Sequence, residues 1–348
     1  MAFRCGGLLA AAVALAAGAA FAAGSTGSQP SLELRGAGST FGQPLISAWI
    51  KARQAADPTV AWHYDPTGSS AGIHSFLAGD VDFAATDRPL SEDERGKAAS
   101  GVSVPYTAGM VVIAYNLPGV SAPLRIGRET LAEIFSGAVR HWNDAKIRAE
   151  NPGIVMPDRT IALIVRREGS GTTYAFTSYL SAISADWNKK GPGVGDRVNW
   201  PDDAMQTFGN EGVSGRIAIT EYSIGYVEYG FASRLALKTA VLQNRDGAFV
   251  AANDQSGAAA LIGAGDGAMP PYGTAAIDPT GANAYPIVTF SWLLLRNHYR
   301  SANVMTAVNA LVDFGLSPDG QNQGERLGYI PLPPAAVKSA QSTLLSLR

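Results

Sequence analysis

The stretch 161–177 constrains the fold of this chain more than any other part of the sequence. Its first five residues are β-branched or apolar, which is typical of a buried strand. Gly169 and Gly171 allow a sharp turn with close backbone approach, and apolar residues at helical spacing follow from Tyr174. The stretch therefore predicts a strand that enters a helix through a short polar turn.

The turn carries groups that suit an anion. A helix start exposes backbone N–H groups and the positive end of the helix dipole, and the hydroxyl side chains after Gly169 add donors. Arg166 or Arg167 supplies a full positive charge, and Glu168 can hold an arginine in place. Taken alone, the stretch also fits an ordinary helix N-cap beside a solvated Arg–Glu pair. The choice between these interpretations depends on similar stretches elsewhere.

The same order of elements occurs twice earlier in the chain. A short strand leads into the glycine- and hydroxyl-rich residues 36–41 and then a helix, and a strand at 60–64 leads into residues 68–72 and another helix. Such turns gather at the carboxyl ends of strands in α/β proteins, where they form the ligand crevice. Three hydroxyl-rich turns favour an α/β fold with an oxyanion site.

An acidic residue stands at the end of a further strand in this region. Residues 81–86 predict a short buried strand, and Asp87 follows it. Asp87 either faces the crevice or caps a turn or helix, and its position alone does not decide between the two. The acidic residues 92–94 are expected to form a solvated first turn of the next helix, where they complement the helix dipole.

Two long apolar runs, 110–115 and 285–295, predict strands that cross between two domains. The helix expected at 304–314 packs on the first domain, and residues 199–213 are interpreted as a loop-rich region. Two crossings imply that one domain is discontinuous and that a hinge connects the domains.

Composition limits the class of protein. The chain has 348 residues, of which 46% are hydrophobic and 16% charged, and its net charge is −2 without a run of basic residues. These values fit a soluble globular protein of two domains and exclude an obligate nucleic-acid binder. Residues 1–23 combine Arg4, an apolar run and an Ala-Phe-Ala sequence, which predicts a secretory signal peptide and an exported mature protein.

The residues that usually hold metals or perform catalysis are sparse. Cys5 is the only cysteine and lies within the predicted signal peptide, so the mature chain is expected to have no disulfide and no thiolate metal site. The four histidines are scattered without metal-ligand spacing, and no Ser-His-Asp arrangement is evident. We therefore expect no metal, no cofactor and no enzymatic activity.

In combination, these motifs resemble the periplasmic phosphate-binding proteins that serve high-affinity phosphate ABC transporters. The resemblance runs almost from end to end of the chain. The motifs that carry it are 36–41, 68–72, 81–87, 135–144, 166–172, 224–229 and 285–287.

The resemblance implies a type II periplasmic-binding-protein fold, with two α/β lobes joined by a two-strand hinge. Residues 24–108 and 286–348 would form the first, discontinuous lobe, and residues 109–285 the second. The resemblance also implies a set of ligands for inorganic phosphate: Thr40, Phe41, Ser69, Asp87, Arg166, Ser170, Gly171 and Thr172. Asp87 matches the acid that receives a phosphate proton, and counting without a gap selects Arg166 rather than Arg167. Glu168 replaces the aspartate that usually steadies this arginine.

The function implied is that of a monomeric periplasmic receptor that captures phosphate and delivers it to an ABC permease in the inner membrane. Two alternatives stay open at this point. One is a secreted phosphatase-like enzyme, although Ser69 and Ser170 lack an evident base. The other is a receptor for a different oxyanion, such as sulfate or molybdate.

Overall fold

The computed structural model describes residues 31–98, 101–265 and 276–347. The predicted signal peptide, residues 1–23, lies outside these ranges. Among the helices of the described ranges, none is long and apolar enough to cross a lipid bilayer.

Strands and helices alternate along much of the chain. The strands are β1 (Leu32–Gly38), β2 (Val60–Asp65), β3 (Phe83–Thr86), β4 (Gly101–Asn116), β5 (Arg125–Ile126), β6 (Ala162–Arg166), β7 (Met205–Thr207), β8 (Ser223–Glu228), β9 (Lys238–Thr239), β10 (Val241–Gln243), β11 (Phe249–Val250), β12 (Ala276–Ile277) and β13 (Ile287–Arg296). The helices are α1 (Gln43–Ala56), α2 (Ser69–Ala78), α3 (Glu92–Lys97), α4 (Arg128–Ser136), α5 (Ala145–Glu150), α6 (Gly171–Ile183), α7 (Ala185–Lys190), α8 (Gly209–Ile219), α9 (Tyr229–Arg234), α10 (Asp254–Ala264), α11 (Ala302–Leu316), α12 (Pro318–Arg326) and α13 (Pro334–Leu345).

One mixed sheet runs through the described chain. Its strand order is β2-β1-β3-β13-β4-β8-β6-β7, with β12 added at β13 and β9 added at β4, and a smaller sheet has the order β11-β10-β5. Strand β1 is parallel to β2 and β3, and β6 is parallel to β7 and β8. The two parallel groups are separated by β13 and β4, which pair with their neighbours in antiparallel fashion.

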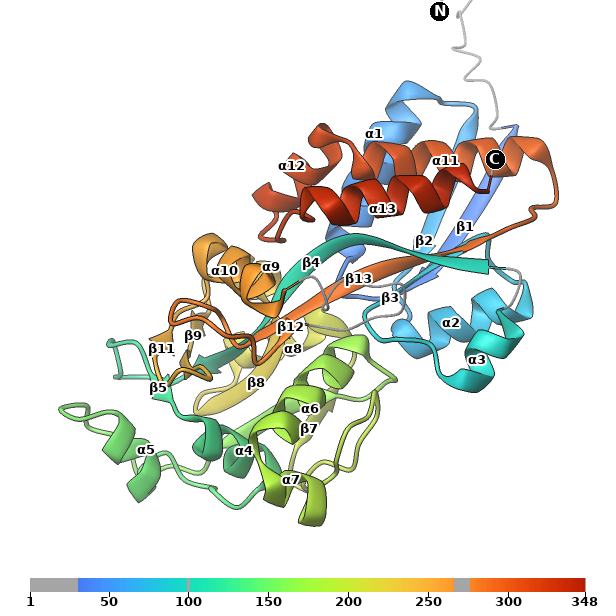
Figure 1. Cartoon of the computed structure of the whole chain (residues 1–348). Helices are drawn as coiled ribbons and strands as arrows, with labels where there is room; N and C mark the ends of the chain where they lie inside the picture. The colour runs from blue at the N-terminus through green and yellow to red at the C-terminus, as the bar shows by residue number, and fades with distance from the viewer. Residues whose placement is uncertain (1–30, 99–100, 266–275, 348) are drawn as a thin grey trace, which may run out of the picture.

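Strand β4 changes its partner along its length. From Gly101 to Met110 it pairs with β13, and from Val111 to Asn116 it pairs with β8. Figure 1 shows β4 and β13 running between two groups of helices. We call β1–β3 with α1–α3 and α11–α13 the first lobe, and β5–β12 with α4–α10 the second lobe. The predicted arrangement of two α/β lobes joined by two strands is confirmed; its residue boundaries stay a prediction.

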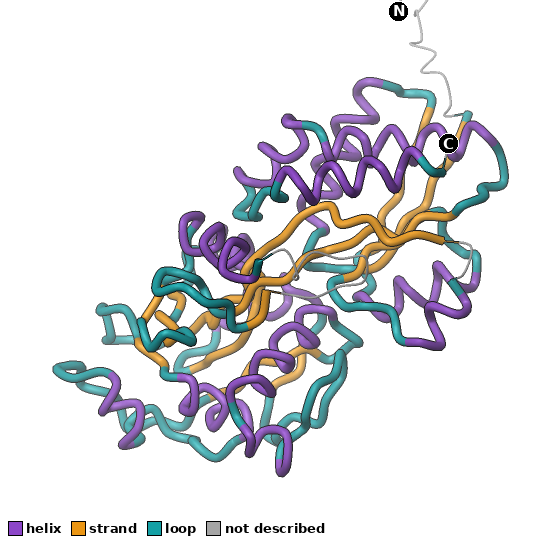
Figure 2. The backbone as a smooth tube through the Cα atoms, viewed as in Figure 1, coloured by secondary structure: helices purple, strands orange, loops and turns teal. Residues whose placement is uncertain are grey.

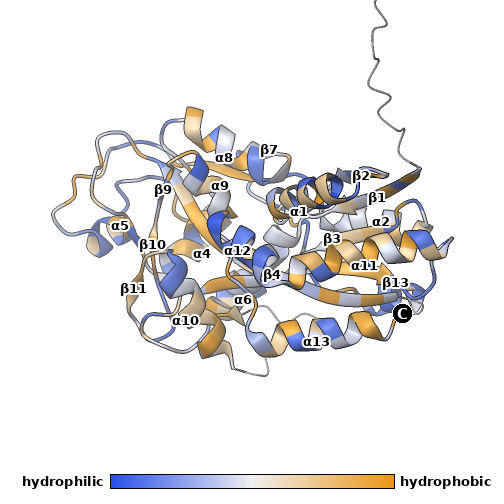
Figure 3. Cartoon of the chain, turned by 90° about the horizontal axis from the view of Figure 1, so that it is seen from above, coloured by the Kyte–Doolittle hydropathy of each residue, from blue (hydrophilic) through white to orange (hydrophobic). Residues whose placement is uncertain are grey.

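The core explains why the crossing strands are apolar throughout. In β13 every residue from Ile287 to Leu295 is buried, and β4 is buried from Val104 to Tyr115. Helices flank the strands on both sides, so the sheet has no solvent-facing side that would require alternating polar residues (Figure 2). The covering helices are amphipathic instead, and Figure 3 shows hydrophobic and hydrophilic residues alternating along α11 and α13.

The predicted strand–turn–helix units are confirmed at β1–α1, β2–α2 and β6–α6, whereas the loop interpretation of residues 199–213 is wrong in part. Residues 205–207 form β7, and α8 begins at Gly209. This is a fourth strand–turn–helix unit, and its short strand and glycine-containing helix concealed it. Its helix start lies at the site described next.

Candidate anion-binding site

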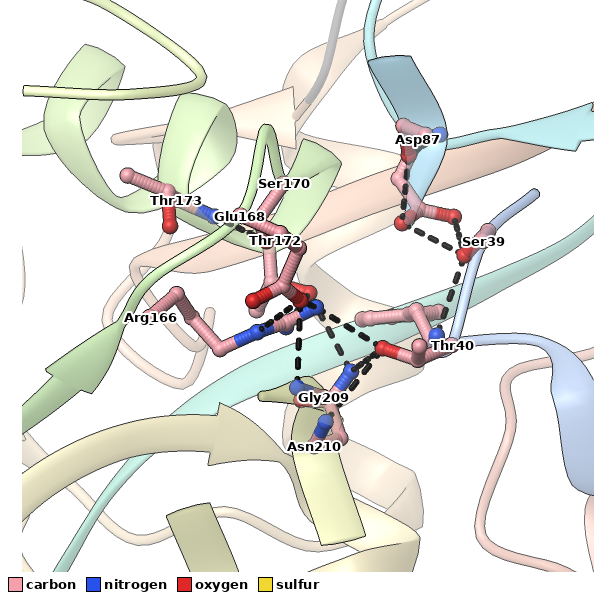
Figure 4. A network of polar contacts seen from close by, with 12 residues as sticks. Ser39, Thr40, Asp87, Arg166, Glu168, Ser170, Thr172, Thr173, Gly209 and Asn210 are labelled. Atoms are coloured by element: carbon pink, nitrogen blue, oxygen red, sulfur yellow. Dashed lines mark hydrogen bonds and ion pairs between the residues drawn. The ribbon is translucent and has the colours of Figure 1, made fainter. Parts of the chain in front are cut away.

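The carboxyl ends of the parallel strands in the two lobes approach each other, as expected for ligand sites in α/β proteins. In the first lobe, β1 leads into Ser39 and Thr40, and β3 leads into Asp87. In the second lobe, β6 ends at Arg166 and β7 leads into α8. Figure 4 shows the polar network that these residues form. Its two halves differ in charge.

The half on the first lobe surrounds a buried carboxylate. Asp87 is 3% exposed and accepts hydrogen bonds from Ser39 Oγ at 2.7 Å to both oxygens, from Ser291 Oγ at 2.6 Å and from Ser69 Oγ at 3.4 Å. Burial raises the pKa of the Asp87 carboxyl to about 6, although these hydrogen bonds and the charge of Arg166 lower it. The carboxylate is therefore charged at neutral pH but poorly solvated, which favours any further donor.

The half on the second lobe is centred on a guanidinium group. The Arg166 side chain is 1% exposed, and its Nε donates to Glu168 Oε1 at 2.7 Å while Nη2 pairs with the same oxygen. Its Nη1 donates to Thr172 Oγ1 at 3.2 Å, and Nη2 donates across the lobes to Thr40 Oγ1 at 2.9 Å. Glu168 thus holds the arginine in place despite being longer than aspartate.

The neighbouring Arg167 is exposed, and its backbone N–H donates to Thr207 of β7. The alternation of side chains along a strand explains the difference, because successive side chains point to opposite faces. Of the two arginines considered from the sequence, Arg166 is the one that lies between the lobes.

Helix α6 begins at this site and is capped by its own sequence. Ser170 is the N-cap, and its Oγ accepts from the N–H of Thr173 at 3.1 Å. For Ser170, the ordinary N-cap considered from the sequence is therefore confirmed. In the part of the chain that the structure describes, the N–H groups of Gly171 and Thr172 have no hydrogen-bond partner. They present donors and the helix dipole to the space between the lobes.

The turns of the two lobes are in contact. A Cβ atom on Gly171 would lie 2.6 Å from Ser69 Oγ and 2.8 Å from Asp87 Oδ2, so only glycine permits this approach of α6 to the carboxylate. The backbone N–H of Ser70 also donates to the carbonyl of Gly169 at 3.2 Å. The start of α6 therefore faces Asp87 directly.

The chain is similar in sequence to known proteins. The PBP superfamily domain matches residues 23–319. The phosphate-binding protein PstS of Xylella fastidiosa is 36% identical over 313 residues, which cover 90% of this chain and 85% of that protein. The protein of the same name from Haemophilus influenzae is 34% identical over 310 residues, which cover 89% of this chain and 91% of that protein. The chain belongs to the PstS family of phosphate-binding proteins.

Solved structures agree with this membership at the level of fold. A high affinity periplasmic phosphate-binding protein, PfluDING, bound with phosphate, has a TM-score of 0.70 at 22% identity and covers 89% of this chain and 93% of its own. An ABC-type phosphate transport receptor from Vibrio cholerae has a TM-score of 0.56 at 18% identity and covers 86% of this chain and 100% of its own. The type II periplasmic-binding-protein fold predicted from the sequence is confirmed.

All eight residues expected from the family resemblance are buried and lie around this network. Phe41 takes part only through its backbone: its N–H donates to Ser39 Oγ at 3.0 Å and its carbonyl accepts from Tyr329 at 2.6 Å. Its ring is fully buried, 6.1 Å from the ring of Tyr329. The other seven contribute side chains or the start of α6.

Three polar residues of the network were not expected from the sequence. Ser39 and Ser291 both donate to Asp87, and Asn210 joins Thr40 to Thr172. A serine at the centre of the apolar strand β13 was a usable signal, because a buried hydroxyl requires a partner. For Asn210 the signal was Gly209 at the start of a helix, although the strand that precedes it, β7, is too short to stand out in the sequence.

An interlobe ion-pair cluster, formed by Ser70, Arg88, Glu94 and Asp196, lies next to this network. Arg88 pairs with Asp196 of the second lobe at 2.8 Å and with Glu94 at 2.8 Å, and Ser70 is hydrogen-bonded to Asp196. The expectation of a solvated acidic first turn at residues 92–94 is confirmed for Glu92 and Asp93 and is wrong for Glu94. Hydrogen bonding from Arg88 lowers the pKa of Glu94 to about 2.

Proposed function

We propose that this protein binds inorganic phosphate between its two lobes, outside the cytoplasm, and delivers it to an ABC permease in the inner membrane. One observation carries the choice of ligand: a buried guanidinium and a buried carboxylate lie in one polar network, close enough for the charge of Arg166 to lower the pKa of Asp87 (Figure 4). A cationic site alone would suit any oxyanion. A carboxylate beside it suits an anion that still carries a proton, because that proton can be donated to the carboxylate.

The proposed ligands divide between the lobes. Thr40 and Ser69 would donate from the first lobe, together with the N–H of Phe41 once it leaves Ser39 Oγ, and Asp87 would accept the phosphate proton. Arg166 would supply the counter-charge, and the start of α6 at Ser170, Gly171 and Thr172 would donate through N–H and hydroxyl groups. Support comes from the burial of all eight residues and from the N–H groups of Gly171 and Thr172 that have no partner in the described chain.

We also propose that residues 24–108 with 286–348 move as one body and residues 109–285 as the other. The change of partner along β4 at Met110 and Val111 supports a hinge there. Phosphate would bridge the bodies, since Arg166 and Thr40 belong to different lobes. A monomeric, periplasmic protein without catalytic activity fits this scheme, and the relatives named phosphate-binding proteins support it.

Isothermal titration calorimetry of the mature protein against phosphate, arsenate, sulfate and molybdate tests the ligand. We expect one phosphate per chain, a strong preference for the tetrahedral anions that keep a proton at neutral pH, and no release of phosphate from phosphate esters. A preference for sulfate or molybdate would support a receptor of another specificity. Turnover of a phosphate ester would support the enzyme instead.

A further inference from the structure

Asn210 is placed where hydroxyl groups of the two lobes meet. It is fully buried at the start of α8, and its side-chain Nδ2 donates to Thr40 Oγ1 at 3.1 Å and to Thr172 Oγ1 at 3.3 Å. Its backbone N–H also points at Thr40 Oγ1, at 3.3 Å. Two of the proposed phosphate ligands, one from each lobe, are thus bonded to one amide (Figure 4).

A hydrogen bond on the side away from the two threonines fixes the orientation of the Asn210 amide. Asn210 Oδ1 accepts from the backbone N–H of Glu228 at 3.0 Å. A backbone N–H can only donate, so the carbonyl side of the amide must face Glu228 and the NH₂ side must face the two threonines. The polarity of the contact to the threonines is therefore set by the main chain at the end of β8.

The orientation of the amide determines whether the hydroxyl groups of Thr40 and Thr172 act as donors or acceptors. A hydroxyl has two acceptor sites and one hydrogen to donate. Thr172 Oγ1 accepts from Arg166 Nη1 at 3.2 Å and from Asn210 Nδ2. Thr40 Oγ1 is approached by three donors, which are Arg166 Nη2 at 2.9 Å and both Nδ2 and the backbone N–H of Asn210. Their acceptor sites are used, and among the described residues neither hydroxyl hydrogen has an acceptor. Both hydroxyls are left as pure donors, which is the form that an anion requires.

We infer that Asn210 is a positioning residue for the anion: it orients the hydroxyls of Thr40 and Thr172 as donors, without itself being required as a phosphate ligand. The inference rests on the proposed phosphate binding. It adds a residue of α8 to the site. The hydrogen bond from Glu228 to Asn210 fixes the direction of the hydrogen bonds that Asn210 makes to Thr40 and Thr172.

The variant Asn210→Asp reverses this polarity with almost no change of shape. One carboxylate oxygen still accepts from Glu228, whereas the other replaces the NH₂ group and accepts the hydroxyl hydrogens of both threonines. We expect calorimetry to show phosphate affinity lowered by about 100-fold or more, because two donors are lost and a negative charge is added. The melting temperature of the phosphate-free variant should stay within a few degrees of wild type, because the carboxylate can also pair with Arg166.

Asn151 provides a matched control. It is a buried asparagine of the second lobe whose Nδ2 donates to the carbonyls of Arg125 and Ile147, outside the site. Asn151→Asp should lower the melting temperature and leave phosphate affinity unchanged within about twofold. A loss of affinity in Asn151→Asp as large as in Asn210→Asp would show that buried carboxylates act through general destabilisation, and would overturn the inference.

A double-mutant cycle separates positioning from direct binding. Asn210→Ala is measured in wild type and in a background that carries Thr40→Val and Thr172→Val. We expect a loss of affinity of about tenfold in the first and less than about twofold in the second, because the hydroxyls through which Asn210 acts are absent there. Equal losses in both backgrounds would make Asn210 a direct ligand or a purely structural residue and would overturn the inference. If wild type did not bind phosphate at all, the proposed function itself would fail, before any variant is compared.

Discussion

The two sides of the site are built from the same structural unit and differ in their charged groups, a carboxylate on the first lobe and an arginine–glutamate ion pair on the second. On the first lobe, the turns after β1, β2 and β3 place hydroxyl groups around the carboxylate of Asp87. On the second lobe, the turn after β6 places Thr172 and Glu168 against the guanidinium of Arg166, and the turn after β7 places Asn210 against Thr172. The unit supplies donors on both sides, whereas the charged groups differ: Asp87 on the first side and the Arg166–Glu168 ion pair on the second.

This difference separates two properties of a binding site. The turns and helix starts provide attraction for any oxyanion, because N–H donors and helix dipoles do not distinguish between anions. Arg166 adds to that attraction, and Asp87 opposes it unless the anion brings a proton. Affinity should therefore depend mainly on the second lobe, and selectivity mainly on the first.

The largest effect is expected at Arg166. Arg166→Ala removes the buried counter-charge and leaves Glu168 buried without its partner, so phosphate binding should weaken by at least about 2 kcal/mol, or roughly 30-fold. The adjacent Arg167→Ala is the control, because that side chain is exposed, and it should bind phosphate like wild type. Calorimetry of both variants decides: the reverse result would assign the counter-charge to Arg167.

The next effect concerns selectivity and Asp87. Asp87→Asn replaces an acceptor by an amide that can also donate, with nearly the same shape, so sulfate should no longer meet an unpaired negative charge. Competition titrations at neutral pH should show that wild type ignores a large excess of sulfate and that Asp87→Asn narrows the gap between phosphate and sulfate. An Asp87→Asn variant that excludes sulfate as completely as wild type would remove Asp87 from this role.

The raised pKa of Asp87 predicts a pH dependence of the same selectivity. Below about pH 6 the carboxyl becomes protonated and can donate, so sulfate competition should strengthen between about pH 7.5 and pH 5 in wild type and not in Asp87→Asn. Sulfate competition that does not change with pH would contradict the assignment of this selectivity to Asp87.

The same raised pKa affects the stability of the ligand-free fold. The folded pKa of Asp87 lies above the value of 3.8 for an unperturbed aspartate, so Asp87 stabilises the fold at low pH, and this contribution is lost as the pH rises towards 6.

The smallest effect is expected at the interlobe ion-pair cluster, which joins the two sides without facing Arg166. Asp196 is 29% exposed, and partly exposed ion pairs contribute at most about 1 kcal/mol. Asp196→Asn should increase the phosphate dissociation rate in stopped-flow measurements by about threefold or less. Asp203→Asn, which breaks an exposed pair with Arg140 inside the second lobe, should change nothing. If Asp196→Asn weakened phosphate binding as much as Arg166→Ala, the bound phosphate would be held mainly by contacts between the lobes rather than by Arg166.

The sequence was sufficient for those parts of the fold that depend on local patterns. Apolar runs predicted β4 and β13, and glycine turns before apolar helices predicted the start of α1, α2 and α6, because these signals lie within a few residues of one another. The choice of Arg166 over Arg167 came from a family resemblance, and the structure gives its physical reason in the side-chain alternation along β6.

What the sequence did not provide depends on distant pairs. Ser291 reaches Asp87 from a strand near the other end of the chain, and Asn210 reaches Thr40 from a different lobe. Nothing within a few residues of Ser291 or Asn210 reveals those partners. For Glu94, which was expected to be solvated, the missing partner lies nearer: Arg88 is six residues away, but the loop between them must fold before the two side chains meet.

The position of β13 in the sheet also determines the order in which the strands can pair during folding. Ala85 of β3 faces Leu293, and Gly109 of β4 faces Thr289, so β13 separates two strands that follow each other closely in sequence. Such contacts between distant residues form late, because a long loop must be closed before they can be made. In synthesis from the amino terminus, the second lobe has its strands β5 to β11 before β13 exists, whereas β12 pairs with β13 and must wait for it. Strand β3, near the start of the chain, therefore stays an edge strand until a strand near the other end has been made.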